Sequence, residues 1–83
     1  MTLNLTLHKK WFDEIASGKK RVEYRENKPY WNARLDGKEF QTVRFKNGYS
    51  SAAPQVVVEC KQIVKKSDFY HIRLGEIRSI CHY

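Results

Sequence analysis

The sequence predicts an α+β fold, a small closed or partly closed β-barrel of five to six strands with one main α-helix and one short helix. Three observations carry this prediction. Several segments alternate between apolar and polar residues, with the period of a β-strand. One segment, from about residue 8 to residue 16, has a helical period instead. Near the C-terminus the alternation slips at Gly75, which indicates a bulge of the kind that bends barrel strands.

The chain is predicted to form one domain, residues 1–83, because 83 residues bury only a modest core. Its composition is globular, with 41% hydrophobic residues. The formal net charge of +7 favours an anionic partner, most simply nucleic acid. The alternative is that the excess of cations serves solubility.

No apolar run approaches the roughly 18 residues of a membrane span, and the N-terminus lacks an apolar stretch long enough for a signal peptide. We therefore expect a cytoplasmic location, where Cys60 and Cys81 stay reduced. The cysteines and histidines are scattered, although His71 and His82 could approach a cysteine in space. We expect no metal site and no cofactor.

The chain begins with a half-buried strand over residues 2–7, whose leucines alternate with polar residues. A helix with a narrow apolar stripe follows, ended by Gly18, where a left-handed cap is favoured. Lys9 and Lys10 lie at the helix N-terminus, which the helix dipole disfavours. That position suggests a surface role such as contact with phosphate.

A strand follows, and its start is dense in charge: four cations and one carboxylate fall between Lys19 and Arg25. Alternation places Glu23 and Arg25 on one face and Val22 and Tyr24 on the other. We expect the apolar face in the core and the charged face outward. Two interpretations stay open: an ordinary solvated strand edge, or a carboxylate held between cations that can meet a phosphate or polarise a carbonyl.

Lys20 shares the apolar parity of that strand, but a turn or bulge at the neighbouring Gly18 could re-aim it. After the strand, Asn27 and Pro29 predict the start of one or two helical turns that end at residues 36–37. Tyr30 and Trp31 in this segment are expected to pack under the loop rather than to stack on bases.

The C-terminal half predicts a strand over residues 40–46, a loop over 47–54, a long β-rich run over 55–65 and a final strand through Gly75. The residues expected in the core share the apolar parity of their segments. They are Leu5, Leu7, Phe12, Ile15, Val22, Val43, Phe45, Val58, Ile72 and Leu74.

One motif resembles a known family. Gly18, Lys20, Glu23 and Arg25 match the pattern G-x-K-x-x-E-x-R of ASCH domains, which are PUA-like β-barrels. Other features follow in the order that the family shows: the N-terminal leucines, Lys10-Trp11-Phe12 with Ile15, Pro29-Tyr30-Trp31 with Arg34, Phe45 with Asn47-Gly48-Tyr49, and Leu74-Gly75-Glu76-Ile77. The resemblance covers nearly the whole chain.

The resemblance implies a PUA-like fold and either an RNA-binding module or a hydrolase. It implies that Arg34 belongs to the pocket region and that Asn47 and Tyr49 lie at the mouth of the cleft as ligand contacts. The structural alternative is that Asn47 adopts a left-handed conformation while Tyr49 packs on the barrel rim. Arg73 is a further candidate for ligand binding.

We consider three functions. The first is RNA binding in a basic cleft, with or without cleavage, in which Lys20 or Glu23 would act as the base and Arg25 would stabilise developing charge. The second is hydrolysis of acylated cytidine-type nucleosides, which family members perform with a lysine assisted by a threonine and a glutamate. Glu23 stands in place of that threonine. The third is a non-enzymatic phage or mobile-element protein that blocks a host nucleoprotein.

The candidate site residues divide into two groups. The candidate catalytic residues are Lys20, Glu23 and Arg25, and the candidate ligand- or RNA-binding residues are Lys9, Lys10, Arg34, Asn47, Tyr49 and Arg73. The expected partner is RNA or a nucleotide-like ligand rather than a membrane, and no feature of the sequence identifies a protein partner.

Overall fold

The structure, a computed structural model, describes residues 1–81 and contains five strands and two helices within them. In chain order these are β1 (Thr2–Leu7), α1 (Lys9–Ala16), β2 (Val22–Glu26), α2 (Pro29–Leu35), β3 (Thr42–Asn47), β4 (Gln55–Lys65) and β5 (Phe69–Cys81). The predicted α+β class, with one longer and one shorter helix, is confirmed. Neither helix is long and apolar enough to cross a membrane.

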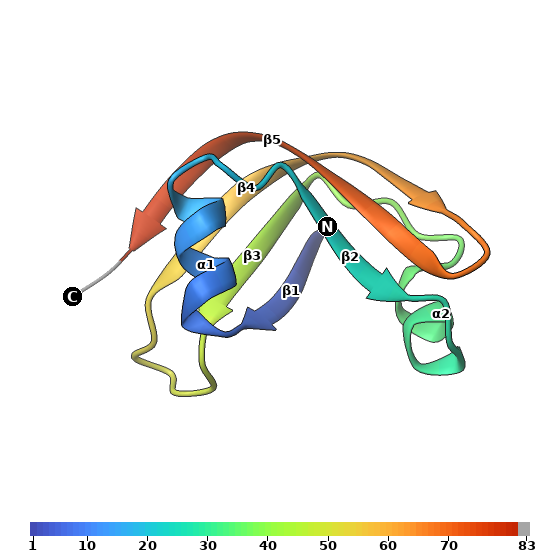
Figure 1. The fold of residues 1–83 in the computed structure, drawn as a ribbon, viewed down its shortest axis with the longest axis horizontal. Helices are drawn as coiled ribbons and strands as arrows, with labels where there is room; N and C mark the ends of the chain where they lie inside the picture. The colour runs from blue at the N-terminus through green and yellow to red at the C-terminus, as the bar shows by residue number, and fades with distance from the viewer. Residues whose placement is uncertain (82–83) are drawn as a thin grey trace.

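The five strands form one sheet in the order β1-β3-β4-β5-β2. β1 pairs with β3 in parallel, and the other pairs are antiparallel. The sheet curls into a half-barrel, with α1 under one end of the arch and α2 under the other (Figure 1). β1 and β2 are its two unpaired edges, so the barrel stays open between them. The predicted PUA-like barrel is therefore partly closed.

The long β4–β5 hairpin contains the bulge that the sequence indicates at Gly75. Val58 lies opposite Ile77, whereas Cys60 lies opposite Leu74, so β5 has one extra residue in this interval. The side chain of Glu59 covers Gly75, where an added Cβ atom would lie 2.1 Å from Glu59 Oε1. Glycine therefore leaves room for the Glu59 side chain at the point where the hairpin bends.

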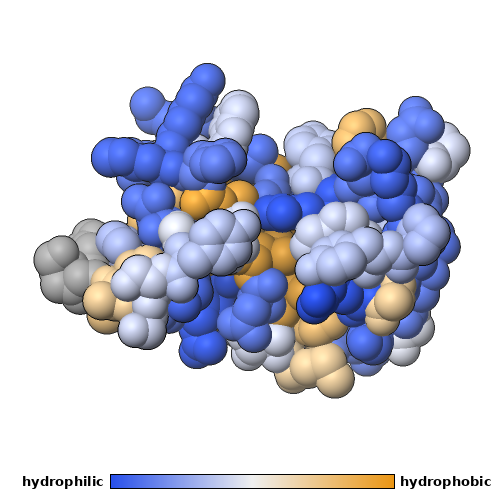
Figure 2. Space-filling model, turned by 90° about the horizontal axis from the view of Figure 1, so that it is seen from below, coloured by the Kyte–Doolittle hydropathy of each residue, from blue (hydrophilic) through white to orange (hydrophobic). Residues whose placement is uncertain are grey.

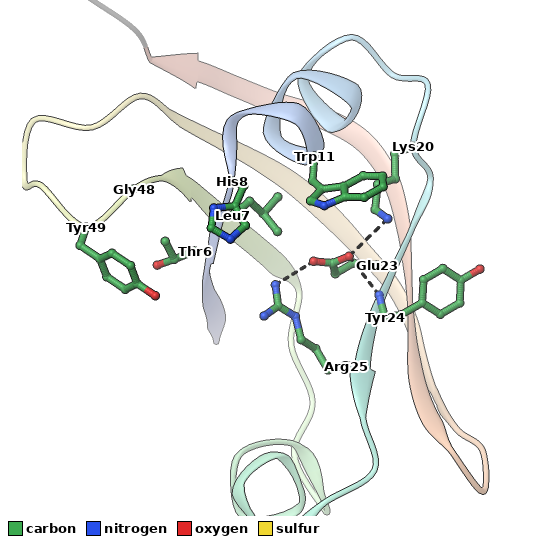
Figure 3. Close-up of a pocket in the computed structure, with 10 residues that line it drawn as sticks. All are labelled: Thr6, Leu7, His8, Trp11, Lys20, Glu23, Tyr24, Arg25, Gly48 and Tyr49. Carbon is green, nitrogen blue, oxygen red and sulfur yellow. Dashed lines mark hydrogen bonds and ion pairs between the residues drawn. The ribbon is translucent and has the colours of Figure 1, made fainter.

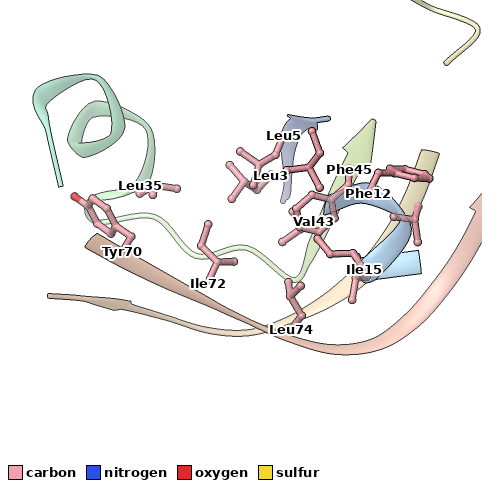
Figure 4. Close-up of a cluster of buried hydrophobic side chains, with 13 residues drawn as sticks. Leu3, Leu5, Phe12, Ile15, Leu35, Val43, Phe45, Tyr70, Ile72 and Leu74 are labelled. Atoms are coloured by element: carbon pink, nitrogen blue, oxygen red, sulfur yellow. The ribbon is translucent and has the colours of Figure 1, made fainter. Parts of the chain in front are cut away.

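The core fills the concave face of the sheet beneath α1 (Figure 4). Val43, Phe45 and Ile72 have no exposed surface, and Phe12 and Ile15 join them from the helix. All the predicted core residues are buried except one, the half-buried Val22. Four residues outside that prediction complete the cluster: Leu3, Leu35, Val56 and Tyr70.

The expected orientation of β2 is wrong. Glu23 faces inward and is only 6% exposed, whereas Tyr24 faces outward and is 48% exposed. The reason is the position of β2 at the edge of the sheet, where its inner face borders the open side of the half-barrel rather than a solid apolar core. A carboxylate is tolerated there because cationic partners offset its desolvation.

Local backbone geometry agrees with most of the predicted helix ends and turns. α1 is followed by Gly18 at φ +82°, and α2 carries Pro29 in its first turn. Two expectations are wrong. Asn27 does not cap α2, because its side-chain amide donates to the carbonyl of Lys66 at 2.8 Å. Asn47 is not left-handed, because the following Gly48 adopts the positive φ that the turn requires.

A polar cluster fixes α2 to the β4–β5 hairpin. The hydroxyl of the buried Tyr70 donates to Asp36 at 2.7 Å and accepts from the Asn32 amide at 2.5 Å, while Lys65 Nζ lies 3.0 Å from Asp36. The Tyr70 and Lys65 hydrogen bonds hold the pKa of Asp36 below its usual value. The bond to Asp36 likewise raises the pKa of Lys65. The short second helix thus has a defined place relative to the sheet.

Candidate functional site

A cleft of about 840 Å³ lies where the two sheet edges approach each other. Its walls come from the end of β1, the start of α1, the β2 segment and the β3–β4 loop (Figure 3). The lining residues are Thr6, Leu7, His8, Trp11, Lys20, Glu23, Tyr24, Arg25, Gly48 and Tyr49. Figure 2 shows the open side of the half-barrel, where apolar surface is visible between surrounding polar side chains.

Glu23 is the centre of this cleft. Its Oε2 accepts a hydrogen bond from Arg25 Nη2 at 2.7 Å. Its Oε1 lies 3.5 Å from Lys20 Nζ and accepts the backbone N–H of Tyr24 at 3.0 Å. Both carboxylate oxygens are therefore engaged, and the side chains of Lys20 and Arg25 are largely buried beside them. The three residues together keep one unit of positive charge.

The turn before β2 aims Lys20 into the cleft, as its neighbour Gly18 suggested. The positive φ of Gly18 reverses the chain after α1, and the Lys20 N–H then donates to the carbonyl of Glu14 at 3.0 Å. The carbonyl of Arg21 accepts from the Leu74 N–H, which anchors the segment to β5 before the strand begins. Lys20 thus escapes the alternation that applies from Val22 onward.

Aromatic rings lie close to both cations. Lys20 Nζ lies 4.8 Å from the centroid of the Trp11 ring and 5.5 Å from that of Tyr24. The Arg25 guanidinium lies 5.1 Å from the Trp31 ring of α2. Arg25 Nε is buried and has no hydrogen-bond partner among the described residues. Such contacts hold the cations in place without neutralising them, so they remain able to attract an anion.

One of the predicted binding residues outside the motif lines the cleft. Tyr49 is on its rim and is 91% exposed, so the alternative that it packs on the barrel is wrong. Lys10 is exposed, with its Nζ 4.8 Å from the Trp11 ring, but it is not among the residues that line the cleft. Asn47 ends β3 beside the lining residue Gly48 but does not line the cleft itself.

Three further predicted residues also lie outside the cleft lining. Arg34 is exposed on α2, with its guanidinium 4.4 Å from the Tyr30 ring. Arg73 is exposed on β5 opposite Val22, and Lys9 forms an exposed ion pair with Asp13 at 2.7 Å. Among the described residues, the cleft lining therefore contains fewer cationic side chains than the sequence analysis assigned to the site.

The two aromatic residues that follow Pro29 differ in their burial. Tyr30 is 59% exposed, so the expectation that it packs in the interior is wrong. Trp31 is partly buried and packs against the core cluster, as predicted. The difference follows from the helical arrangement of α2, in which consecutive residues point in directions about 100° apart.

Several lining residues did not emerge from the sequence as site candidates. Thr6 and Leu7 were assigned to an ordinary strand, and His8 to a helix boundary. The signal that points to them is topological: they lie where an edge strand turns into α1, directly across the open seam from β2. Trp11, on the apolar stripe of α1, is 42% exposed and lines the cleft.

No group of three or more metal-ligating side chains occurs within residues 1–81. The possible approach of His82 to a cysteine, considered from the sequence, concerns a residue outside the described range. Cys60 is half-buried, and burial raises the pKa of its thiol, which disfavours the reactive thiolate.

A half-barrel with a cleft between its edge strands defines a small PUA-like domain. The family model of the ASCH domain matches residues 5–73, and the chain therefore belongs to the ASCH family. Membership of this family supports RNA binding as the general property of the domain. A search among curated proteins finds no match.

Proposed function

We propose that this protein binds RNA in the cleft between β1 and β2, with Lys20 and Arg25 on phosphate and Trp11 against a base. The observation that carries the proposal is the convergence of both cations on Glu23, at 3.5 Å and 2.7 Å. One carboxylate fixes the two cations and leaves a net positive charge, which suits a phosphodiester. Trp11 is 42% exposed beside Lys20, and its ring suits a stacked base.

The charge of the whole chain supports the same ligand. A net charge of +7 raises the local concentration of a polyanion and speeds its encounter with the cleft. A neutral nucleoside would gain nothing from this excess. The proposal therefore concerns phosphate-bearing RNA rather than a free base.

The proposal is one of binding, because Glu23 has no oxygen left without a donor. A general base must accept a proton from the ligand, and here the carboxylate already faces two cations and a backbone N–H. Any hydrolysis of RNA or of an acylated nucleoside would depend on Lys20. The cytoplasmic location stays a prediction from the sequence.

The test is a fluorescence-anisotropy titration of a labelled single-stranded RNA at two salt concentrations. We expect the logarithm of affinity to fall with the logarithm of salt, with a slope of about 0.7 per phosphate neutralised. Arg25→Ala and Lys20→Ala should each weaken binding. The matched control is Lys66→Ala, which removes the same charge from the exposed β4–β5 turn and should change affinity little.

A turnover assay on the same RNA and on acylated cytidine completes the test. Product formation that Lys20→Ala abolishes would establish catalysis in addition to binding. Equal weakening by Lys66→Ala and Arg25→Ala would instead show that binding follows net charge alone and would reject the cleft as the site.

A further inference from the structure

Tyr24 is a large aromatic side chain that the fold does not use in its core. It lies on the outer face of β2, and its ring meets the edge of the His71 ring with centroids 4.8 Å apart and an interplanar angle of 78°. Tyr24 is 48% exposed, so part of its ring stays accessible beside the contact with His71. Exposed, rigidly held aromatic rings are what single-stranded nucleic acids use as stacking surfaces.

The same residue also borders the cleft, so the outer face of β2 and the cleft are continuous. Lys20 links the two: its ammonium lies 4.8 Å from the Trp11 ring and 5.5 Å from the Tyr24 ring. Figure 3 shows the ammonium between the two rings, with Tyr24 directed away from the cleft interior. The order in space is aromatic ring, cation, aromatic ring.

We propose that the site takes a single-stranded dinucleotide or longer RNA, with consecutive bases on Trp11 and Tyr24 and the phosphodiester that joins them at Lys20. This inference rests on the proposed function and adds a second base position to it. Each nucleotide step of a single strand presents a base, a phosphate and the next base, which matches the order of ring, cation and ring. A mononucleotide would use only the cleft half of this arrangement.

The charged residues around Tyr24 also favour single-stranded RNA as the ligand. Arg21 and Arg73 are exposed next to this strand, and Arg73 lies opposite Val22 in the β2–β5 ladder. The acidic residue on β2 beyond Tyr24 is Glu26, which is paired with Lys28 at 3.2 Å. An RNA strand that leaves the cleft over Tyr24 toward Val22 therefore meets Arg21 and Arg73, whereas in the other direction it meets a carboxylate that Lys28 already pairs.

The experiment compares two probes of equal charge by isothermal titration. One is the dinucleotide ApA, and the other is adenosine 3′-(methyl phosphate), which has the same single phosphodiester but lacks the second base. Wild-type protein should bind ApA more tightly. Tyr24→Ala should weaken ApA binding about 5- to 150-fold, the range for loss of one stacked base, and change binding of the methyl phosphate less than twofold. Trp11→Ala should weaken both.

The matched control is Tyr30→Ala, which removes another exposed tyrosine, on α2, and should leave both affinities unchanged. Tyr24→Phe should retain most of the ApA affinity, because stacking needs the ring and not the hydroxyl. Tyr24→Leu keeps apolar contact with His71 without a ring, and it replaces Tyr24→Ala if thermal unfolding shows that the alanine variant is not folded.

The possible outcomes separate this inference from the proposed function. If Trp11→Ala and Lys20→Ala weaken both probes while the Tyr24 variants bind ApA like wild type, the second base position is wrong and the cleft stands. Equal weakening of both probes by Tyr24→Leu would also overturn it. If wild-type protein binds neither these probes nor longer RNA, the proposed function itself is wrong and the second base position falls with it.

Discussion

Glu23 and Arg25 lie two residues apart on β2 and share its inner face, where Arg25 Nη2 donates to Glu23 Oε2 at 2.7 Å. Alternation makes this pairing possible, because residues i and i+2 of a strand point the same way. The pair is largely buried at the seam of the half-barrel, with Lys20 on the other carboxylate oxygen. The same carboxylate therefore contributes to the stability of this seam and to the proposed ligand site.

The first prediction concerns Glu23→Gln. The variant keeps the shape of the side chain but loses its charge, so Lys20 and Arg25 are left without an anionic partner. We expect a loss of about 1.5–3 kcal/mol in the free energy of unfolding, the usual contribution of hydrogen bonds to charged groups. Urea unfolding at neutral pH measures it.

The same variant should respond more strongly to inorganic phosphate. Without the carboxylate, the two cations gain more from a bound anion, and ligand that binds only the folded state raises stability. We expect a larger rise in melting temperature with phosphate for Glu23→Gln than for wild type. A smaller rise would contradict the assignment of Lys20 and Arg25 as an anion site. Arg25→Ala serves as the control that removes the effect.

The second prediction concerns the core. Phe45 is fully buried on β3, beneath α1, and truncation leaves a cavity in the centre of the cluster. Phe45→Ala should cost about 3–5 kcal/mol, a large part of the roughly 4–12 kcal/mol expected for 83 residues. Circular dichroism during thermal unfolding measures it, with Phe69→Ala, an exposed aromatic residue, as the control. An unchanged melting temperature for Phe45→Ala would refute the assignment.

The third prediction concerns acid stability. Because the pKa of Asp36 is lower in the folded protein than in the unfolded chain, its ionised form stabilises the fold. This contribution is fully present above the unfolded value of about 3.9 and is lost as the pH falls through the lower folded value. Asp36→Asn should therefore be less stable than wild type at pH 7, and the difference should shrink below about pH 4.

Urea unfolding at several pH values tests this dependence. Asp68→Asn, at an exposed position in the β4–β5 turn, is the matched control and should follow wild type throughout. A constant difference between wild type and Asp36→Asn from pH 7 to pH 3 would show that the cluster with Tyr70 and Lys65 does not depend on the charge of Asp36.

The strands were predictable because each carries its own alternation, and the bulge was predictable because Gly75 interrupts one. The inward direction of Glu23 was not, since a single strand does not reveal whether its inner face meets a core or an open seam. Val22 and Tyr24 are more apolar than their neighbours, so alternation alone assigns them to the interior. Only the position of β2 at the sheet edge reverses that choice.

The candidate site was predictable where its residues are close in sequence. Lys20, Glu23 and Arg25 lie within one motif and do converge, whereas Arg34 and Arg73 were placed with them by charge and resemblance. Their distance from the cleft lining depends on where α2 and the β2–β5 ladder carry them. His8 was not predicted because its place in the cleft lining depends on the approach of β1 to β2, which no local sequence pattern encodes.

The parallel pairing of β1 with β3 has a consequence for the order of folding. Thr2 lies opposite Thr42, so this ladder forms only after some forty residues have been brought into a closed loop. The β4–β5 hairpin, joined by a short turn, has the lowest entropic barrier among the strand pairs. We infer that the hairpin nucleates folding and that β1 docks last, which would place the completion of the cleft at the end of the reaction. Amide exchange during refolding that protects β1 before the hairpin would show the opposite order.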